Sequence, residues 1–281
     1  MDFEGTPRQR PSWHHASTEL DHFATVSYRV EPGLITRHLP SGVVPEVLDF
    51  DDGGHDALVS AVVFRDRDFH FRLCPRVSMS CGQINYRAYV RAQGERGVWF
   101  FGTALDHPLV VVPRMLWQMP WHRAQIRIGA EAGRWHMTAA DSSGTSHCEL
   151  NVTDRALGRL DGFNDASETL QTLTHPTDGW YRRRDGAIGR YSIWHDVMAA
   201  RHCSITSARF TFLEELGLIT SSCKPHSALT QPTIHFDIHT PPRRLRSKAL
   251  PAAAQVRTSL SQLGLWPIGC TFRQRQRRHP R

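Results

Sequence analysis

Three polar residues alternate along one predicted strand and could bind an anionic small molecule. Residues 82–91 have the sequence GQINYRAYVR, in which Gln83, Asn85 and Arg87 share one face and apolar residues occupy much of the other. Such alternation is typical of a β-strand with one polar face. A guanidinium can hold a carboxylate through two hydrogen bonds, and the amides can orient a carbonyl. We predict that this face lines a pocket; the alternative is a solvent-exposed face.

Four further side chains belong to the predicted site. His122 and His195 could act as general acid or base, because an unperturbed histidine pKa of about 6.5 suits proton transfer near neutral pH. With 17 histidines in the chain, a structural role is the alternative for each. Arg114, in an expected short helix, is either an anion contact or half of a packing salt bridge. Trp121 either covers the pocket or belongs to the core.

The sequence has no motif that indicates a cofactor. It contains no glycine-rich phosphate loop, no G-x-S-x-G element and no H-E-x-x-H motif. His235, Asp237 and His239 alternate at a spacing that metal ligands also use, but no further ligand cluster accompanies them. Cys81 adjoins the polar strand without a basic partner that the sequence can place, which favours a buried thiol over a nucleophile. We expect neither a cofactor nor a metal ion.

The net charge of +7 comes from the C-terminal end of the chain. Residues 243–281 carry ten Arg or Lys and no Asp or Glu, which leaves 24 basic and 27 acidic side chains, a charge of −3, in residues 1–242. Binding of nucleic acid would therefore depend on this tail, for which a solvated extension is the alternative. We expect that the rest of the protein binds no nucleic acid.

Composition and length indicate a globular protein and permit either one large domain or two small ones. The chain of 281 residues is 40% hydrophobic and 22% charged, as in ordinary globular proteins. No apolar run approaches the roughly 18 residues of a membrane-spanning helix, and residues 1–15 lack the apolar stretch of a signal peptide. We expect no membrane contact, a cytoplasmic location and six free cysteines.

Local patterns predict many strands and three short helices. The expected strands are Phe23–Val30, Ala57–Phe64, Gly82–Arg91, Val98–Leu105, His122–Ile128, Trp135–Ala139, His147–Val152, Trp180–Arg184, Ile188–His195, Met198–Ile205 and Ile234–Ile238. The expected helices are Leu109–Met119, Ser167–Leu173 and Ser207–Leu216, and the charge-dense segment Arg65–Arg72 is expected as a loop or exposed edge. This pattern favours an antiparallel, β-rich α+β fold. We expect an N-terminal extension (1–10), one domain (11–242) and a basic, partly disordered tail (243–281).

From about His14 to Thr240 the chain resembles the YqjF-like family of uncharacterised bacterial proteins, within the acetoacetate decarboxylase-like superfamily. The resemblance is carried by INYRAYVR followed by RGVWFF, by the block PRMLWQMP, and by YRRRDG with a downstream Trp-His pair. It implies a β-rich, cone-like barrel with a central pocket, and a tendency to form homo-oligomers.

The chain departs from the superfamily at the residues that carry the decarboxylase chemistry. The best-known enzyme uses a lysine amine, in a Pro-Lys-Lys block, to form a Schiff base with a ketone. The matching block here is Pro120-Trp121-His122, and the nearest candidate lysine, Lys224, lies in an unrelated loop-like stretch. A carboxylate expected on the polar strand is replaced by the amide of Gln83, which cannot accept a proton in the same way.

We therefore predict an enzyme that acts on an oxo- or carboxylate-bearing metabolite through acid–base and electrostatic catalysis, without a Schiff-base lysine. Decarboxylation, dehydration and isomerisation are all compatible with the residues. The alternative is a small-molecule-binding protein of the same fold that performs no chemistry.

Overall fold

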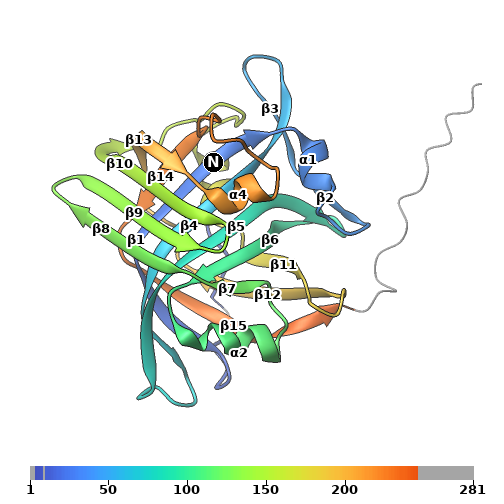
Figure 1. Cartoon of the computed structure of the whole chain (residues 1–281), viewed down its shortest axis with the longest axis vertical. Helices are drawn as coiled ribbons and strands as arrows, with labels where there is room; N and C mark the ends of the chain where they lie inside the picture. Colours follow the sequence, from blue (N-terminus) through green and yellow to red (C-terminus); the bar gives the residue numbers. More distant parts are fainter. Residues whose placement is uncertain (1–3, 9, 246–281) are drawn as a thin grey trace, which may run out of the picture.

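The computed structural model describes residues 4–8 and 10–245, which form a β-rich structure with a few short helices (Figure 1). The strands are β1 (Ala16–Val30), β2 (Val43–Pro45), β3 (Val47–Asp49), β4 (His55–Phe71), β5 (Ser78–Ala92), β6 (Glu95–Leu105), β7 (Trp121–Arg123), β8 (Gln125–Glu131), β9 (Arg134–Asp141), β10 (Gly144–Ala156), β11 (Asp178–Arg182), β12 (Ile188–His195), β13 (Arg201–Arg209), β14 (Ser227–Gln231) and β15 (Ile234–Leu245). The helices are α1 (Pro32–Thr36), the 3-10 helix η1 (Pro108–Val110), α2 (Val111–Leu116), α3 (Ala166–Thr174) and α4 (Thr211–Glu215).

Seven strands pair in a closed circuit whose order is β1-β4-β5-β6-β11-β12-β15 and back to β1. One edge of β1 pairs with β4 over its whole length. The other edge pairs with β15 through Leu20 and with β14 from Phe23 onward. His22, with φ of 51°, lies between these two pairings, at an irregularity in the β1–β4 register. At this branch point, one edge of β1 changes its partner from β15, in the closed circuit, to β14, in a second branch of the sheet.

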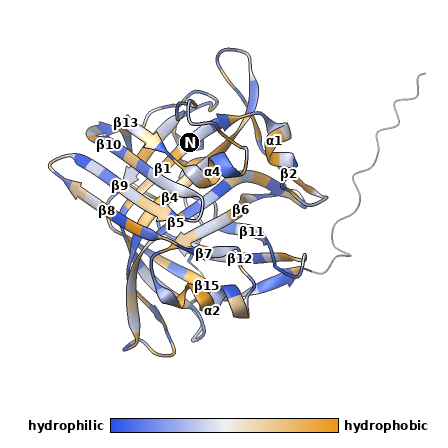
Figure 2. Cartoon of the chain, viewed as in Figure 1, coloured by the Kyte–Doolittle hydropathy of each residue, from blue (hydrophilic) through white to orange (hydrophobic). Residues whose placement is uncertain are grey.

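The second branch, β14-β13-β10-β9-β8, lies against the outer face of the circuit (Figure 1). The main core fills the space between them. It joins apolar side chains of β1, β4 and β5 with Trp135 and Met137 of β9, Leu150 of β10 and Phe210 before α4. Figure 2 shows the hydrophobic colouring along these paired strands. One face of β1, β4 and β5 is thereby buried, and their other face points into the circuit.

The predicted alternation of β5 is confirmed, but both of its faces are buried. Ile84 and Tyr86 belong to the main core, whereas Gln83 and Arg87 are 9% and 8% exposed on the inner face. The fully apolar strand predicted beside it is β6, which is buried along most of its length. The turn between them uses Gln93 and Gly94, both with positive φ, as a tight hairpin requires.

Three local expectations are corrected by the structure. The segment expected as a loop or exposed edge after residue 64 continues β4 to Phe71, with Asp66 buried between exposed Arg65 and Arg67. Strand β13 runs to Arg209, so the helix expected from Ser207 begins only at Thr211. The sheet is not wholly antiparallel, because β6 pairs in parallel with β7 and β11. The strands expected at Trp135–Ala139 and His147–Val152 are confirmed as β9 and β10, which form an antiparallel meander with β8.

The ends of the described chain both contact the circuit. Near the N-terminus, the Thr6 carbonyl accepts a hydrogen bond from Trp194 Nε1 (2.7 Å), and Arg8 pairs with Asp237 (2.8 Å). Strand β15 continues to Leu245, past the expected domain end at residue 242. The rest of the predicted tail lies outside the described residues. None of the helices in the described part of the chain has the length and apolar character needed to cross a membrane.

Candidate functional site

Residues from all seven strands of the circuit line a cavity of about 270 Å³. Its walls are mainly aromatic and aliphatic, with a small set of polar groups, as is usual for small-molecule sites. Five of the seven predicted site residues line it: Gln83, Asn85, Arg87, Trp121 and His195. Side chains on β5, β7 and β12, far apart in sequence, are thus brought together.

Arg87 is a buried cation on the inner face of β5. Its Nη2 donates to the Leu173 carbonyl (2.8 Å), and its guanidinium carbon lies 5.5 Å from the centre of the Tyr89 ring. Its Nε, although buried, has no hydrogen-bond partner. Within residues 4–8 and 10–245, no carboxylate forms an ion pair with Arg87, and no other Arg or Lys lines the cavity. A buried charge is costly unless paired, so this end of the cavity favours an anion.

The two amides on β5 form an ordered row beside Arg87. Asn85 Oδ1 accepts hydrogen bonds from Gln83 Nε2 and from Thr103 Oγ1, both at 2.9 Å. These donors fix the orientation of the Asn85 amide and leave its Nδ2 group as a donor toward a ligand. Such a group can hold a carbonyl oxygen.

Trp121 stands at the position that the resemblance assigns to the Schiff-base lysine. Strand β7 pairs Trp121 with Thr103 of β6, so the indole lies on the wall that carries Asn85. Lys224 is exposed and is not a lining residue, and Lys248 lies outside the described residues. Among the described residues, no lysine amine faces the cavity.

His195 is a buried, uncharged imidazole near neutral pH. Burial lowers its pKa to about 4, and the positive charges of His175 and Arg87 contribute to the same effect. Nδ1 lies 2.7 Å from the Asp196 carbonyl and therefore carries the proton, which leaves Nε2 as an acceptor. The ring stacks on Phe236, with 4.4 Å between ring centres.

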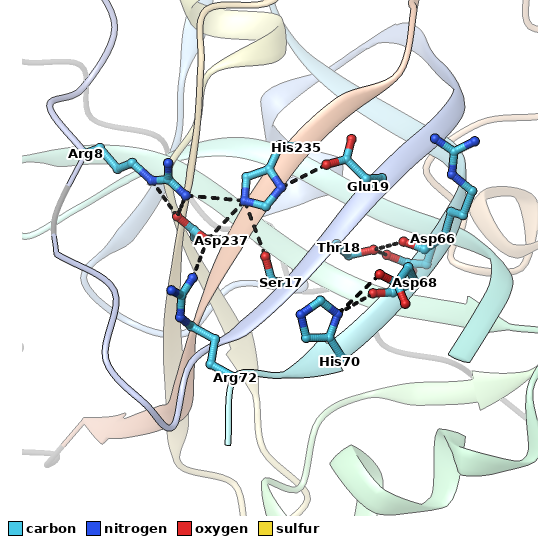
Figure 3. Close-up of polar contacts among 11 residues, drawn as sticks. Arg8, Ser17, Thr18, Glu19, Asp66, Asp68, His70, Arg72, His235 and Asp237 are labelled. Carbon is cyan, nitrogen blue, oxygen red and sulfur yellow. Dashed lines mark hydrogen bonds and ion pairs between the residues drawn. The ribbon is translucent and has the colours of Figure 1, made fainter. Parts of the chain in front are cut away.

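Asp66 is a cavity residue that the sequence analysis did not identify. It is 5% exposed, and burial raises its pKa to about 7. Thr18 Oγ1 donates to its Oδ1 at 3.1 Å (Figure 3). The Cys81 thiol lies 3.9 Å from Oδ2. A carboxyl that titrates near neutral pH inside a cavity is suited to proton transfer. The sequence pattern could have identified it, because Val62, Phe64 and Asp66 alternate along one face of the strand.

Arg114 and His122 are not among the cavity-lining residues. Arg114 is exposed on α2. His122 Nε2 lies 3.0 Å from Asp141 Oδ2, and its ring stacks on Phe212 at 5.1 Å between centres. Since neighbouring residues of a strand point to opposite faces, Trp121 and His122 cannot both face the cavity from β7.

The two histidines predicted as proton carriers are expected to behave differently. His195→Ala should weaken the binding of a cavity ligand by about tenfold, because it removes a buried wall and a hydrogen-bond acceptor. His122→Gln should change the same dissociation constant by less than about twofold. Isothermal titration with a 2-oxo acid checks both, and an equal effect of the two substitutions would contradict this placement.

The alternating residues considered as metal ligands have protein partners instead. His235 bonds to Glu19 (3.0 Å) and Asp237 (3.2 Å), and Asp237 also pairs with Arg8 (Figure 3). His239 lies 3.1 Å from the Ser192 hydroxyl. The described residues contain no group of three or more His, Cys, Asp or Glu arranged to hold a metal ion.

The fold is that of acetoacetate decarboxylase-like proteins. The chain is similar to acetoacetate decarboxylase from Legionella pneumophila subsp. pneumophila str. Philadelphia 1, with a TM-score of 0.56, 13% identity, and coverage of 86% of this chain and 92% of that one. It is similar to the enduracididine biosynthesis enzyme MppR complexed with pyruvate (TM-score 0.58, 13% identity, 85% and 93%). It is also similar to an acetoacetate decarboxylase-like enzyme from Sphingomonas wittichii RW1, with a TM-score of 0.58, 14% identity, and coverage of 84% of this chain and 94% of that one.

Identities this low establish the shared fold alone. The family is established by sequence: residues 17–237 match the model of DUF2071, described as "Uncharacterized conserved protein (COG2071)", and the chain belongs to this family. No curated protein matches the chain in sequence.

Proposed function

We propose that this protein binds a small carboxylate- or oxo-bearing metabolite and acts on it by acid–base and electrostatic catalysis. The observation that carries the proposal is Arg87, a buried guanidinium with an unpartnered Nε at the wall of an apolar cavity. Its rigid fork of donors suits a carboxylate. The proposal excludes a Schiff base, since Trp121 occupies the position of the superfamily's lysine.

The other polar groups of the cavity have distinct roles in this proposal. The free amide of Asn85, held in place by Gln83 and Thr103, donates to the ligand's carbonyl oxygen. His195, neutral because of burial, accepts a hydrogen bond through Nε2. Asp66 pairs with Cys81, six residues along β5 from Arg87, so it acts on a part of the ligand remote from the carboxylate; its pKa of about 7 lets it both release and accept a proton there near neutral pH.

The fold supports this ligand class by analogy. MppR, which shares the fold, has been solved with pyruvate, a 2-oxo acid. We also propose four properties expected from the sequence: membership of the YqjF-like proteins, a cone-like barrel shape, a cytoplasmic location and self-association. The cytoplasmic location rests on the absence of a signal-peptide stretch in residues 1–15, and the other three rest on the sequence blocks that resemble that family.

A binding protein without chemistry is the second candidate. Two observations favour it: position 83 holds an amide, and the imidazole of His195 is a weak base with a pKa of about 4. Asp66 is then the principal group able to exchange a proton near neutral pH. Asp66→Asn distinguishes the candidates, because an enzyme would lose product formation while keeping ligand affinity, and a binding protein would form no product in either case.

Thermal unfolding against keto acids, hydroxy acids and small lactones tests the proposal. A ligand present at 100 times its dissociation constant adds about 2.7 kcal/mol to the free energy of unfolding. For a domain of this size, that corresponds to a rise in Tm of about 5–10 °C. The expected result is a rise with at least one acid that disappears in Arg87→Met. A rise of equal size in the variant would refute the anion contact.

A further inference from the structure

We propose that the ligand is a monocarboxylic acid with an extended apolar tail, whose carboxylate meets Arg87 and whose tail points toward η1 and α2. The inference rests on the proposed function and adds the substrate class to it. Pyruvate-sized acids would then be poor ligands, and acids with a chain or ring beyond the first three carbons would be good ones.

The two ends of the cavity differ in exposure. Arg87, at one end of the lining part of β5, is 8% exposed. At the other end, Met79 on β5 and Phe69 and Phe71 on β4 are partly exposed, and Leu109 of η1 is 47% exposed. The cavity therefore opens beside the β4–β5 hairpin and η1, and the cation lies away from this opening.

The walls between the two ends are apolar and long. Val62 and Phe64 of β4 and Leu105 of β6 line the cavity beside the amide row. Phe69 of β4 and Met79 of β5, which pair with each other, continue the apolar wall beyond it. Cys81, opposite Asp66, is six residues from Arg87, and at about 3.4 Å per residue the two positions are about 20 Å apart along the strand. Side chains bridge part of that span, but a three-carbon acid held at Arg87 would leave much of the wall uncovered.

The size of the cavity fits such a tail. An apolar cavity of about 150 Å³ is large enough to bind benzene. This cavity, of about 270 Å³, therefore has room for a carboxylate and an apolar group of at least that size.

The mouth carries exposed apolar side chains. Leu109, Val111, Met115 and Leu116 are 47–69% exposed on η1 and α2, and Figure 2 shows hydrophobic colouring on α2. Clustered apolar exposure often marks a binding site. Of these four, Leu109 lines the cavity. An apolar tail that reaches the mouth would cover it.

The test is the affinity of straight-chain 2-oxo acids from pyruvate through 2-oxobutanoate and 2-oxohexanoate to 2-oxooctanoate, measured by isothermal titration with the full chain. Each buried methylene should lower the dissociation constant about fourfold, which corresponds to about 0.8 kcal/mol, until the cavity is filled. The acid with the longest chain that fits should bind at least about a hundredfold more tightly than pyruvate.

Two leucines on neighbouring helices provide a matched pair of variants. Leu109→Asn should weaken the binding of 2-oxooctanoate by about fivefold and leave that of pyruvate unchanged, because only the long tail reaches the mouth. Leu116→Asn, at a residue that is 69% exposed and does not line the cavity, should change neither. Both substitutions are at exposed positions, so folding should be preserved, and circular dichroism verifies this.

The outcomes separate this inference from the proposed function. Affinities that do not depend on chain length but are lost in Arg87→Met would overturn the inference and leave the anion contact intact. Affinities that rise with chain length but survive Arg87→Met would overturn the anion contact, and this inference with it. Absence of binding by every acid would overturn both.

Discussion

Arg87→Met should raise the dissociation constant of any carboxylate ligand on the order of 100-fold. Hydrogen bonds to a charged group contribute about 1.5–3 kcal/mol each, and Arg87 can supply more than one. The ligand-free protein should lose no more than about 1 kcal/mol of stability, since the variant also removes a buried, uncompensated charge. The Leu173 carbonyl keeps the Tyr89 hydroxyl as a donor at 3.3 Å. Titration calorimetry and urea unfolding measure the two quantities.

Arg87→Lys is the matched control for this substitution. It keeps the positive charge but loses the planar fork of donors, so affinity should fall less than in Arg87→Met. Equal losses in the two variants would show that geometry rather than charge dominates. An unchanged dissociation constant in Arg87→Met would remove the basis of the proposed function.

Asp66→Asn should change how stability depends on pH. Burial raises the pKa of Asp66 from an ordinary value of 3.8 to about 7, so between these pH values the folded state binds a proton that the unfolded state has released. The free energy of unfolding of the wild type therefore falls as pH rises through this window, by on the order of a few kcal/mol. Asparagine does not titrate, so the variant should lack this decline and be the more stable protein above pH 7.

The difference between variant and wild type isolates this effect. The lowered pKa of His195 acts in the opposite direction, because stability is lost as pH falls below about 6.5, but it is present in both proteins and cancels. Urea unfolding at pH 4.5, 6 and 8 measures the difference. If it stays constant across these pH values, Asp66 titrates normally and is a poor candidate for the proton carrier.

The polar strand was predictable because its periodicity is local. Gln83, Asn85 and Arg87 alternate with core residues, and the structure confirms that alternation. That the polar face points into a cavity depends on the pairing of β1 with β4 and of β1 with β15 at the far end of the chain. Pairings between segments this far apart in sequence leave no local signal.

Strand alternation also explains the positions of the two residues, Asp66 and His122, that were not predicted correctly. Asp66 was not predicted as a cavity residue because the charged residues around it suggested a loop. It nevertheless lies on the same inward face of β4 as Phe64. His122 follows Trp121 on a short strand, so alternation already separates the two. Strand β14, which pairs with β1, was not predicted; its five buried residues include Ser, Thr and Gln and show no clear period.

In the proposed function, Arg87 recognises the carboxylate of a ligand in the cavity. The most direct measurement compares the tightest-binding acid with its uncharged amide, in the wild type and in Arg87→Met. We expect the wild type to prefer the acid by at least about tenfold and the variant to lose this preference, which is a coupling between the two changes. The same acid-to-amide ratio in both proteins would contradict the claim.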